Sequence, residues 1–249
     1  MSWITKEDTI IFDSEFNEKL DIELISAYTK LIFSNYELDN KLFESYKNNN
    51  FTNSEKKINN FNDFGSKLNL FNRDVSSLPQ GITHLTFSTY FNQDVSNLPQ
   101  SLIHLIFGWY FNKDVSNLPP TLTYLTFGYS FNHDVSNLPQ SLTHLTFGWL
   151  FNKDVSVLPH FLTNLTFGFR FNQDVSNLPP LLTHLTFGSC FNRDISNIPS
   201  TLIHLTFGID FNQDVSNLPP FLTHLTFDYR FNQQYDIPPN IKYLKLNCN

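Results

Sequence analysis

The chain has 249 residues, of which 41% are hydrophobic and only 16% charged, and its net charge is −7. Acidic residues outnumber basic ones both before and after residue 70, and no long run of Lys or Arg occurs, which argues against nucleic acid and anionic membranes as partners. No apolar stretch reaches the roughly 18 residues that span a bilayer, and residues 1–12 lack the apolar core of a signal peptide. Two cysteines do not form a disulfide framework in a chain of this length, so we expect a soluble, cytoplasmic protein.

Residues 1–57 contain no repeat, and their apolar residues recur at helical spacing. Asp13 or Ser14 is the expected N-cap of a first helix, and a second, shorter helix is expected before residue 48. The apolar stripe of the first comprises Leu20, Leu24, Ile25, Tyr28, Leu31 and Ile32, and that of the second Leu38, Leu42 and Tyr46. The sequence therefore predicts a small α-helical N-terminal segment, followed at residues 58–70 by a linker and first cap.

From Phe71 onward the sequence repeats every 20 residues. The unit reads F-N-x-D-V-S-x-L-P-x-x-L-T-H-L-T-F-G-x-x; eight full units span 71–230, and a degenerate ninth unit, one residue shorter, spans 231–249. Of the 27 Phe, nine open a unit and eight stand at its seventeenth position. A fixed period of this length is typical of a solenoid, in which each unit stacks on its neighbours.

The segment L-x-x-L-x-F is the strand pattern of leucine-rich repeats. Alternation along a strand points Leu145 and Phe147 inward and His144 and Thr146 outward. The rest of the unit, D-V-S-x-L-P, is short and contains a proline, which a helix interior does not accept. We therefore expect a mainly β, leucine-rich-repeat-like solenoid with one short parallel strand per unit, and extended or 3₁₀ backbone in place of most helix on the convex side.

Two polar columns accompany the return path of the chain. The first is a column of aspartates, which could bind calcium or form Asx-turns. Calcium needs about 6–8 oxygen ligands, and the Gly-rich nonapeptide of calcium-binding repeats is absent. We therefore favour Asx-turns, in which each carboxylate accepts the N–H of the Ser two residues on. This column consists of Asp74, Asp94, Asp114, Asp134, Asp154, Asp174, Asp194 and Asp214. The second column begins at Asn72, and we expect its side chains to satisfy backbone groups of the turns.

A histidine column occupies the outward face of the predicted sheet, interrupted by Tyr124 and Asn164. Its members are His84, His104, His144, His184, His204 and His224. Zinc requires three or four ligands in a tetrahedral array, whereas one ligand per unit lies in a line without carboxylates, so we expect no metal here. Cys190 has no oriented base beside it, and no Gly-rich phosphate loop follows a strand. The sequence predicts neither an enzyme nor a cofactor.

The two residues after the glycine of each unit vary most, while the residues that build the solenoid stay constant. The pair after the proline varies as well. Trp and Tyr are common binding hot spots, so these aromatic side chains are candidate contacts for a protein partner: Tyr90, Trp109, Tyr110, Tyr129, Trp149, Phe169 and Tyr229. Alternatively the rings only pack on each other along the edge of the solenoid, and the histidine column is the alternative binding face.

These units resemble the FNIP repeat family, a relative of leucine-rich repeats found in social amoebae and giant viruses of amoebae. The resemblance covers residues 71–249 and rests on Phe191-Asn192 with Ile198-Pro199, and on Ile237-Pro238 in the last unit. It implies a non-enzymatic protein-interaction scaffold, acting in the host cytoplasm if the chain is viral. Some family members carry an N-terminal F-box, which would make the chain a substrate adaptor that binds ubiquitin-ligase components. Residues 1–57 lack the usual opening Leu-Pro of an F-box, so both a plain cap and a degenerate F-box remain open.

Overall fold

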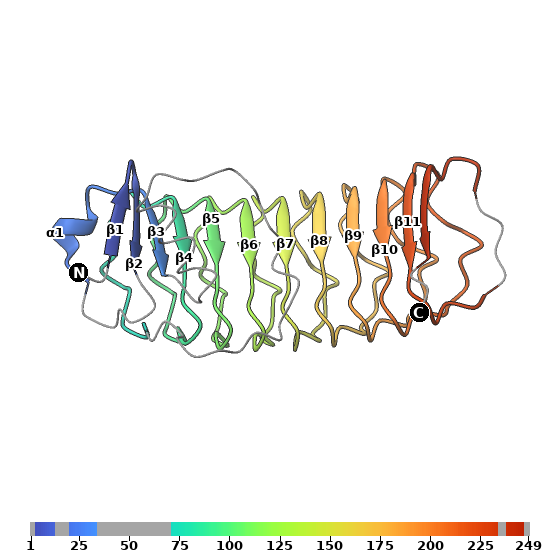
Figure 1. The fold of residues 1–249 in the computed structure, drawn as a ribbon, viewed down its shortest axis with the longest axis horizontal. Helices are drawn as coiled ribbons and strands as arrows, with labels where there is room; N and C mark the ends of the chain where they lie inside the picture. The colour runs from blue at the N-terminus through green and yellow to red at the C-terminus, as the bar shows by residue number, and fades with distance from the viewer. Residues whose placement is uncertain (1–2, 13–19, 34–70, 234–237, 247–249) are drawn as a thin grey trace.

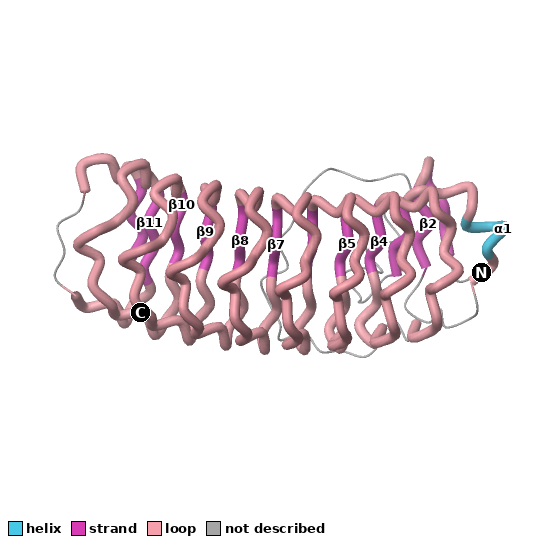
Figure 2. Tube along the Cα trace, turned by 180° about the vertical axis from the view of Figure 1, so that it is seen from behind, coloured by secondary structure: helices cyan, strands magenta, loops and turns pink. Residues whose placement is uncertain are grey.

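The computed structural model describes residues 3–12, 20–33, 71–233 and 238–246, which form an elongated solenoid (Figure 1). Its strands stand side by side along the long axis, and loops return behind them (Figure 2). All of the strands belong to one 12-stranded sheet whose order follows the chain from β1 to β12. The predicted solenoid is therefore confirmed.

The sheet begins with strands outside the repeat. β1 (Trp3–Lys6) and β2 (Thr9–Phe12) form an antiparallel hairpin, and β2 pairs in parallel with β3 (Lys30–Phe33), which pairs with the first strand of the repeat. The repeat strands are β4 (His84–Thr86), β5 (His104–Ile106), β6 (Tyr124–Thr126), β7 (His144–Thr146), β8 (Asn164–Thr166), β9 (His184–Thr186), β10 (His204–Thr206), β11 (His224–Phe227) and β12 (Tyr243–Leu246).

Each repeat strand pairs in parallel with the same positions of the next unit. Leu145 lies opposite Leu125 on one side and Leu165 on the other. Leu145 and Phe147 are 1% and 2% exposed, while His144 and Thr146 are half-buried on the outward face. The predicted strand, its direction and its alternation are thus confirmed.

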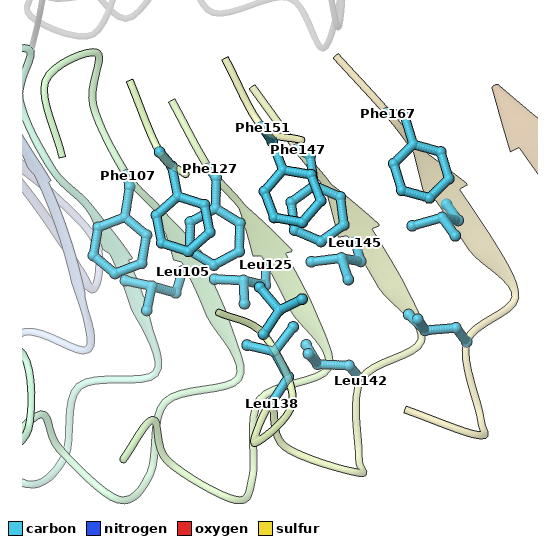
Figure 3. Packing of buried hydrophobic residues seen from close by; sticks show 14 of the residues in the cluster. Leu105, Phe107, Leu125, Phe127, Leu138, Leu142, Leu145, Phe147, Phe151 and Phe167 are labelled. Carbon is cyan, nitrogen blue, oxygen red and sulfur yellow. The ribbon is translucent and has the colours of Figure 1, made fainter. Parts of the chain in front are cut away.

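Two columns of phenylalanine fill the core behind the strands (Figure 3). The ring of Phe147 stacks on Phe151, which opens the next unit, with centroids 3.7 Å apart, and it also stacks on Phe167 of that same unit at 5.7 Å. The Val and Leu of the return path are buried too, Val95 and Leu98 each being 1% exposed. Because the same side chains meet at every step, the core is continuous along the repeat.

Hydrogen bonds of the side chains hold the return path, which contains no helix within residues 71–233. In all eight Asp residues of the first polar column, one carboxylate oxygen accepts the Ser N–H two residues on at 2.9–3.2 Å and the other accepts the Ser hydroxyl at 2.6–2.9 Å. These are the predicted Asx-turns. The Asn column forms a ladder in which each Oδ1 accepts the N–H of the next Asn at 2.9–3.2 Å, from Asn72 to Asn232.

The N-terminal segment differs from the predicted helix. The only helix among the described residues is α1 (Ile22–Ile25), a single turn whose N-cap is Asp21, not Asp13 or Ser14. Leu31 and Phe33 belong to β3 and are buried, so the helical interpretation of the stripe is wrong there. Lys30 to Phe33 repeats the inward pattern of a unit strand, and pairing with β4 outweighs the local helical spacing.

The segment nevertheless covers the first unit of the solenoid, since the ring of Phe33 stacks on Phe71 with centroids 4.1 Å apart. An F-box is a bundle of short helices, whereas the described residues of this segment form three strands and one helical turn. The predicted second helix and the linker at 58–70 lie outside the described residues.

Six of the eight full units have a glycine after the strand, and this glycine packs closely against the unit before it. A Cβ added at Gly128 would lie 1.9 Å from the carbonyl oxygen of Gly108, and one at Gly148 would lie 1.8 Å from that of Gly128. Because the atom met is backbone, no side-chain rotation relieves the overlap. The glycine column therefore sets how closely the corners of neighbouring units approach.

The first prediction concerns the core. Phe147→Ala should lower the free energy of unfolding by about 3–5 kcal/mol, because it removes a buried ring and leaves a cavity. Chemical denaturation followed by circular dichroism measures the change, with Thr146→Ala on the outward face as control. A loss below about 0.5 kcal/mol, the size of a neutral surface change, would contradict the role of this ring.

The second prediction concerns the glycine column. Gly148→Ala should destabilise the solenoid by at least about 1–3 kcal/mol, the usual cost of overpacking. Gly81 is the matched control, because a Cβ there meets nothing within 4 Å, and Gly81→Ala should change stability by less than about 1 kcal/mol. Urea denaturation measures both stabilities. Equal values for the two variants would contradict the role of Gly148 in the close contact between neighbouring units.

Candidate functional site

Two outward surfaces carry the residues that the sequence singled out. The aromatic edge is the corner that follows the strands, where Trp109, Tyr129, Trp149 and Phe169 lie in four successive units. The histidine face is the outward side of the sheet itself. Its members are His84, His104, His144, His184, His204 and His224.

Backbone hydrogen bonds fix the aromatic edge. The N–H of Ser130 donates to the carbonyl of Trp109, and that of Leu150 to the carbonyl of Tyr129, both at 2.9 Å. This second ladder continues the pairing beyond the strands, so equivalent residues of successive units remain in register. The rings of the aromatic edge are consequently brought over one another.

The four rings form one stack. Centroids are 4.4 Å apart between Trp109 and Tyr129, 5.7 Å between Tyr129 and Trp149, and 4.1 Å between Trp149 and Phe169, with ring planes within 17° of parallel. The four side chains are half-buried. Since the ring faces are engaged with each other, the edges of the rings are what this surface offers to a partner.

The remaining candidates lie in other groups. Tyr90 stacks on Tyr110 at 5.1 Å in the neighbouring column, and Tyr110 is 46% exposed. Tyr229 is 44% exposed, and the guanidinium of Arg230 lies 5.6 Å from the centroid of the Tyr229 ring. The same guanidinium forms an ion pair with Asp210 at 3.0 Å. The structure therefore divides the predicted aromatic residues into three groups.

The histidine face consists of two ring stacks separated by Asn164. The first runs from His84 to His144 through Tyr124, with centroids 4.1–5.6 Å apart. The second runs from His184 to Tyr243 at 3.9–4.4 Å. Asn164 occupies the same strand position between them.

Threonine hydroxyls contact the imidazoles of this face. The hydroxyl oxygen of Thr143 lies 3.1 Å from the Thr123 carbonyl oxygen and 2.9 Å from Nδ1 of His144. A hydroxyl has one proton, so it donates fully to only one of these two acceptors at a time. The same pair of contacts recurs at His84, His184 and His224.

Burial favours the neutral form of four of the six imidazoles. Burial lowers the pKa of His104 to about 4, and the neighbouring His84 and His144 add to the effect. Burial also lowers the pKa values of His84, His184 and His204. Positions 5–17 of all eight full units contain no Lys, Arg, Asp or Glu, so the face between the two corners offers uncharged hydrogen-bonding groups.

Neither a metal centre nor an activated nucleophile emerges from the part of the chain that the structure describes. No group of three or more His, Cys, Asp or Glu there could hold a metal ion. Burial, and then the charge of Asp210, raise the pKa of the Cys190 thiol, which disfavours the thiolate needed for attack. No described helix is long and apolar enough to cross a membrane.

The sequence interpretation missed a set of exposed apolar side chains at the opposite corner, before the strands. Phe161, Leu181 and Phe221, all at the eleventh position of a unit, are 58%, 42% and 67% exposed. The variable pair after the proline was the signal that pointed to them, because the same position is Gly, Ser or Thr in the other full units.

The third prediction follows from the lowered pKa of His104. The folded state binds fewer protons than the unfolded chain between the ordinary His value of about 6.5 and the folded value of about 4, so stability should fall as pH drops through this window. His104→Tyr, which introduces the side chain that Tyr124 supplies in the next unit, should flatten the slope between about pH 7 and 5, above the Asp range. Urea denaturation across this range measures it; identical slopes would contradict the assignment.

Comparison with known proteins places this geometry in context. The model of the FNIP Repeat family matches seven overlapping or adjoining stretches that together span 71–249, at residues 71–108, 94–130, 111–149, 131–170, 151–190, 171–210 and 211–249. Among curated protein sequences, no match was found.

Two solved structures are similar. The giant-virus protein CroV588, described as a novel circular LRR protein, is 30% identical with a TM-score of 0.71; the match covers 99% of this chain and 41% of that one. YopM from Yersinia enterocolitica WA-314 is 18% identical with a TM-score of 0.45, covering 68% of this chain and 47% of that one. The chain thus spans less than half of either protein, and its seven family matches make it a member of the FNIP repeat family.

Proposed function

We propose that this protein is a non-enzymatic scaffold that binds a protein partner along the aromatic edge. The leucine-rich-repeat-like solenoid is a fold typical of protein–protein interaction, and its in-register units supply a rigid support for side chains at the corner. The ring edges of Trp109, Tyr129, Trp149 and Phe169 would provide the contact.

One observation carries this proposal: the solenoid does not need rings at the aromatic edge. Ser189 and Ile209 occupy the same position in later units, and the backbone ladder continues there, with the N–H of Asp210 donating to the Ser189 carbonyl at 2.8 Å. Four successive aromatic residues at a position that tolerates serine favour recognition, since specificity requires units that differ from one another and Trp and Tyr are frequent hot spots.

The fourth prediction tests the aromatic edge. The triple variant Trp109→Ser, Tyr129→Ser, Trp149→Ser should lose partner capture in a quantitative pull-down while keeping its melting temperature, because Ser189 shows that serine fits this position. Each hot-spot truncation typically costs about 2 kcal/mol of binding.

The matched control changes the histidine face, with His144→Ser, His184→Ser and His204→Ser, and should keep the partner. If the control loses the partner and the edge variant keeps it, the binding surface is the histidine face. A large fall in the melting temperature of the edge variant would instead assign the rings to packing alone.

A further inference from the structure

The two ends of the sheet differ in how far they are covered. At the N-terminal end, β3 lies outside the repeat but pairs in parallel and in register with β4, and β2 pairs with β3 in turn. The inward residues of these added strands are buried, since Leu31, Phe33 and Phe12 are 0%, 1% and 2% exposed. The edge of the repeat sheet therefore accepts an added strand of non-repeat sequence.

At the C-terminal end, β12 is the last strand of the sheet, and among the described strands it pairs only with β11. Leu246 is 51% exposed, whereas Phe227, its counterpart in β11, is buried. Tyr243 is 63% exposed, although its ring stacks on His224 with centroids 4.4 Å apart. The last strand thus exposes side chains at positions that a neighbouring strand covers in the interior of the array.

The backbone of β12 is oriented to receive a further parallel strand. In the repeat, the outward residue at the fourteenth position donates its N–H back to the preceding unit, and the inward residue at the seventeenth donates forward, as Phe207 does to the Thr226 carbonyl at 2.9 Å. Tyr243 likewise donates back to the Thr223 carbonyl at 3.0 Å. Alternation along the strand therefore points the N–H and C=O of Leu244 away from β11.

The charge at this end of the sheet is positive. Lys242 and Lys245 stand where all eight full units carry Thr or Ile, and residues 238–246 contain no Asp or Glu. Both lysines are exposed, and neither has an ion-pair partner in the part of the chain that the structure describes. Lysine on an edge strand disfavours pairing with a second copy, but it favours a neighbouring strand of opposite charge.

The N-terminal end of the same sheet contains a lysine that is paired in this way. Lys30, which opens β3, lies opposite Thr9 of β2. Its Nζ lies 3.4 Å from a carboxylate oxygen of Asp8, the residue immediately before β2. The strand next to this lysine is thus accompanied by a carboxylate at the neighbouring position.

We propose that β12 binds an extended segment of a partner protein as a thirteenth, parallel strand. Apolar residues at alternate positions of the segment lie beside Leu244 and Leu246, and an acidic residue between them lies beside Lys245. Backbone hydrogen bonds supply affinity and the alternating side chains supply specificity, as in other cases of strand addition. This surface is the end of the sheet and not the aromatic edge, so its use does not depend on the function proposed above.

The test uses the full chain and a fluorescein-labelled peptide in which valine alternates with glutamate. The peptide has about eight residues, within the usual length of a strand. Fluorescence anisotropy should show saturable binding to wild type. The variant Lys242→Glu, Lys245→Glu should bind at least about tenfold more weakly, because it places like charges beside each other.

The matched control for this variant is Lys113→Glu, Lys153→Glu, which changes the net charge equally at exposed positions of the return path and should bind like wild type. All four lysines are exposed, so both variants should keep the wild-type melting temperature. The aromatic-edge triple variant should bind the peptide like wild type, so failure at one surface is distinguishable from failure at the other.

Two N-methylated peptides test the strand geometry. Methylation at every glutamate removes the N–H groups that an outward residue donates to the preceding strand, as Tyr243 donates to β11. Binding of this peptide should fall at least about tenfold, since several hydrogen bonds are lost together. Methylation at every valine removes the N–H groups on the far side of the added strand and should leave binding nearly unchanged.

Three results would overturn the proposal. The variant Lys242→Glu, Lys245→Glu could bind the peptide as wild type does. The peptide methylated at glutamate could bind like the unmodified peptide, which would show contact without strand pairing. Wild type could fail to bind the peptide while Lys242→Thr, Lys245→Thr self-associates in light scattering, which would leave the lysines only the role of protecting the edge.

Discussion

In-register parallel pairing is the constraint from which this structure follows, because it places every side chain against its own counterpart about one strand spacing away. Phenylalanine rings of neighbouring units stack on each other. Each asparagine side-chain oxygen accepts the backbone N–H of the next asparagine. Each glycine leaves room for the carbonyl of the unit before it. Aspartate is tolerated because each carboxylate is held by the serine of its own unit and faces solvent. The repeat is therefore uniform because each position requires a residue that can pack against a copy of itself.

The same constraint explains why variation between units concentrates at the corners. Between the two corners the sheet is nearly identical from unit to unit, and threonine hydroxyls contact Nδ1 of four of its imidazoles. Such a face offers repetition but little discrimination. At the corners the backbone is held by its own ladder, so side chains as different as Trp149 and Ser189 fit the same position.

The period and the strand pattern were sufficient to predict the solenoid, its inward residues, the Asx-turns and the Asn ladder, because each depends on contacts within a unit or with an identical neighbour. The N-terminal segment was harder. Lys30 to Phe33 matches the strand pattern, yet a single copy surrounded by helical spacing does not stand out, and only pairing with β4 decides its conformation. The stacking at the aromatic edge could not be derived from alternation, since the strand ends before it. Phe161 belongs to the variable pair after the proline, and that variability does not reveal whether its ring is buried or exposed.

The glycine column also bears on how such an array can change its length. Neighbouring interior units contact each other through the same residues at every step. Recombination that removes or duplicates one whole unit would therefore restore an equivalent contact between units. The first and the eighth full units are exceptions, because they carry Ser88 and Asp228 where the six units between them have glycine. The hydroxyl of Ser88 donates to the Phe71 carbonyl. Moved to the place of Gly128, a residue with a Cβ would collide with the carbonyl of the unit before it. Expansion and contraction are therefore confined to the interior of the array, and the unit that meets the N-terminal strands keeps its place.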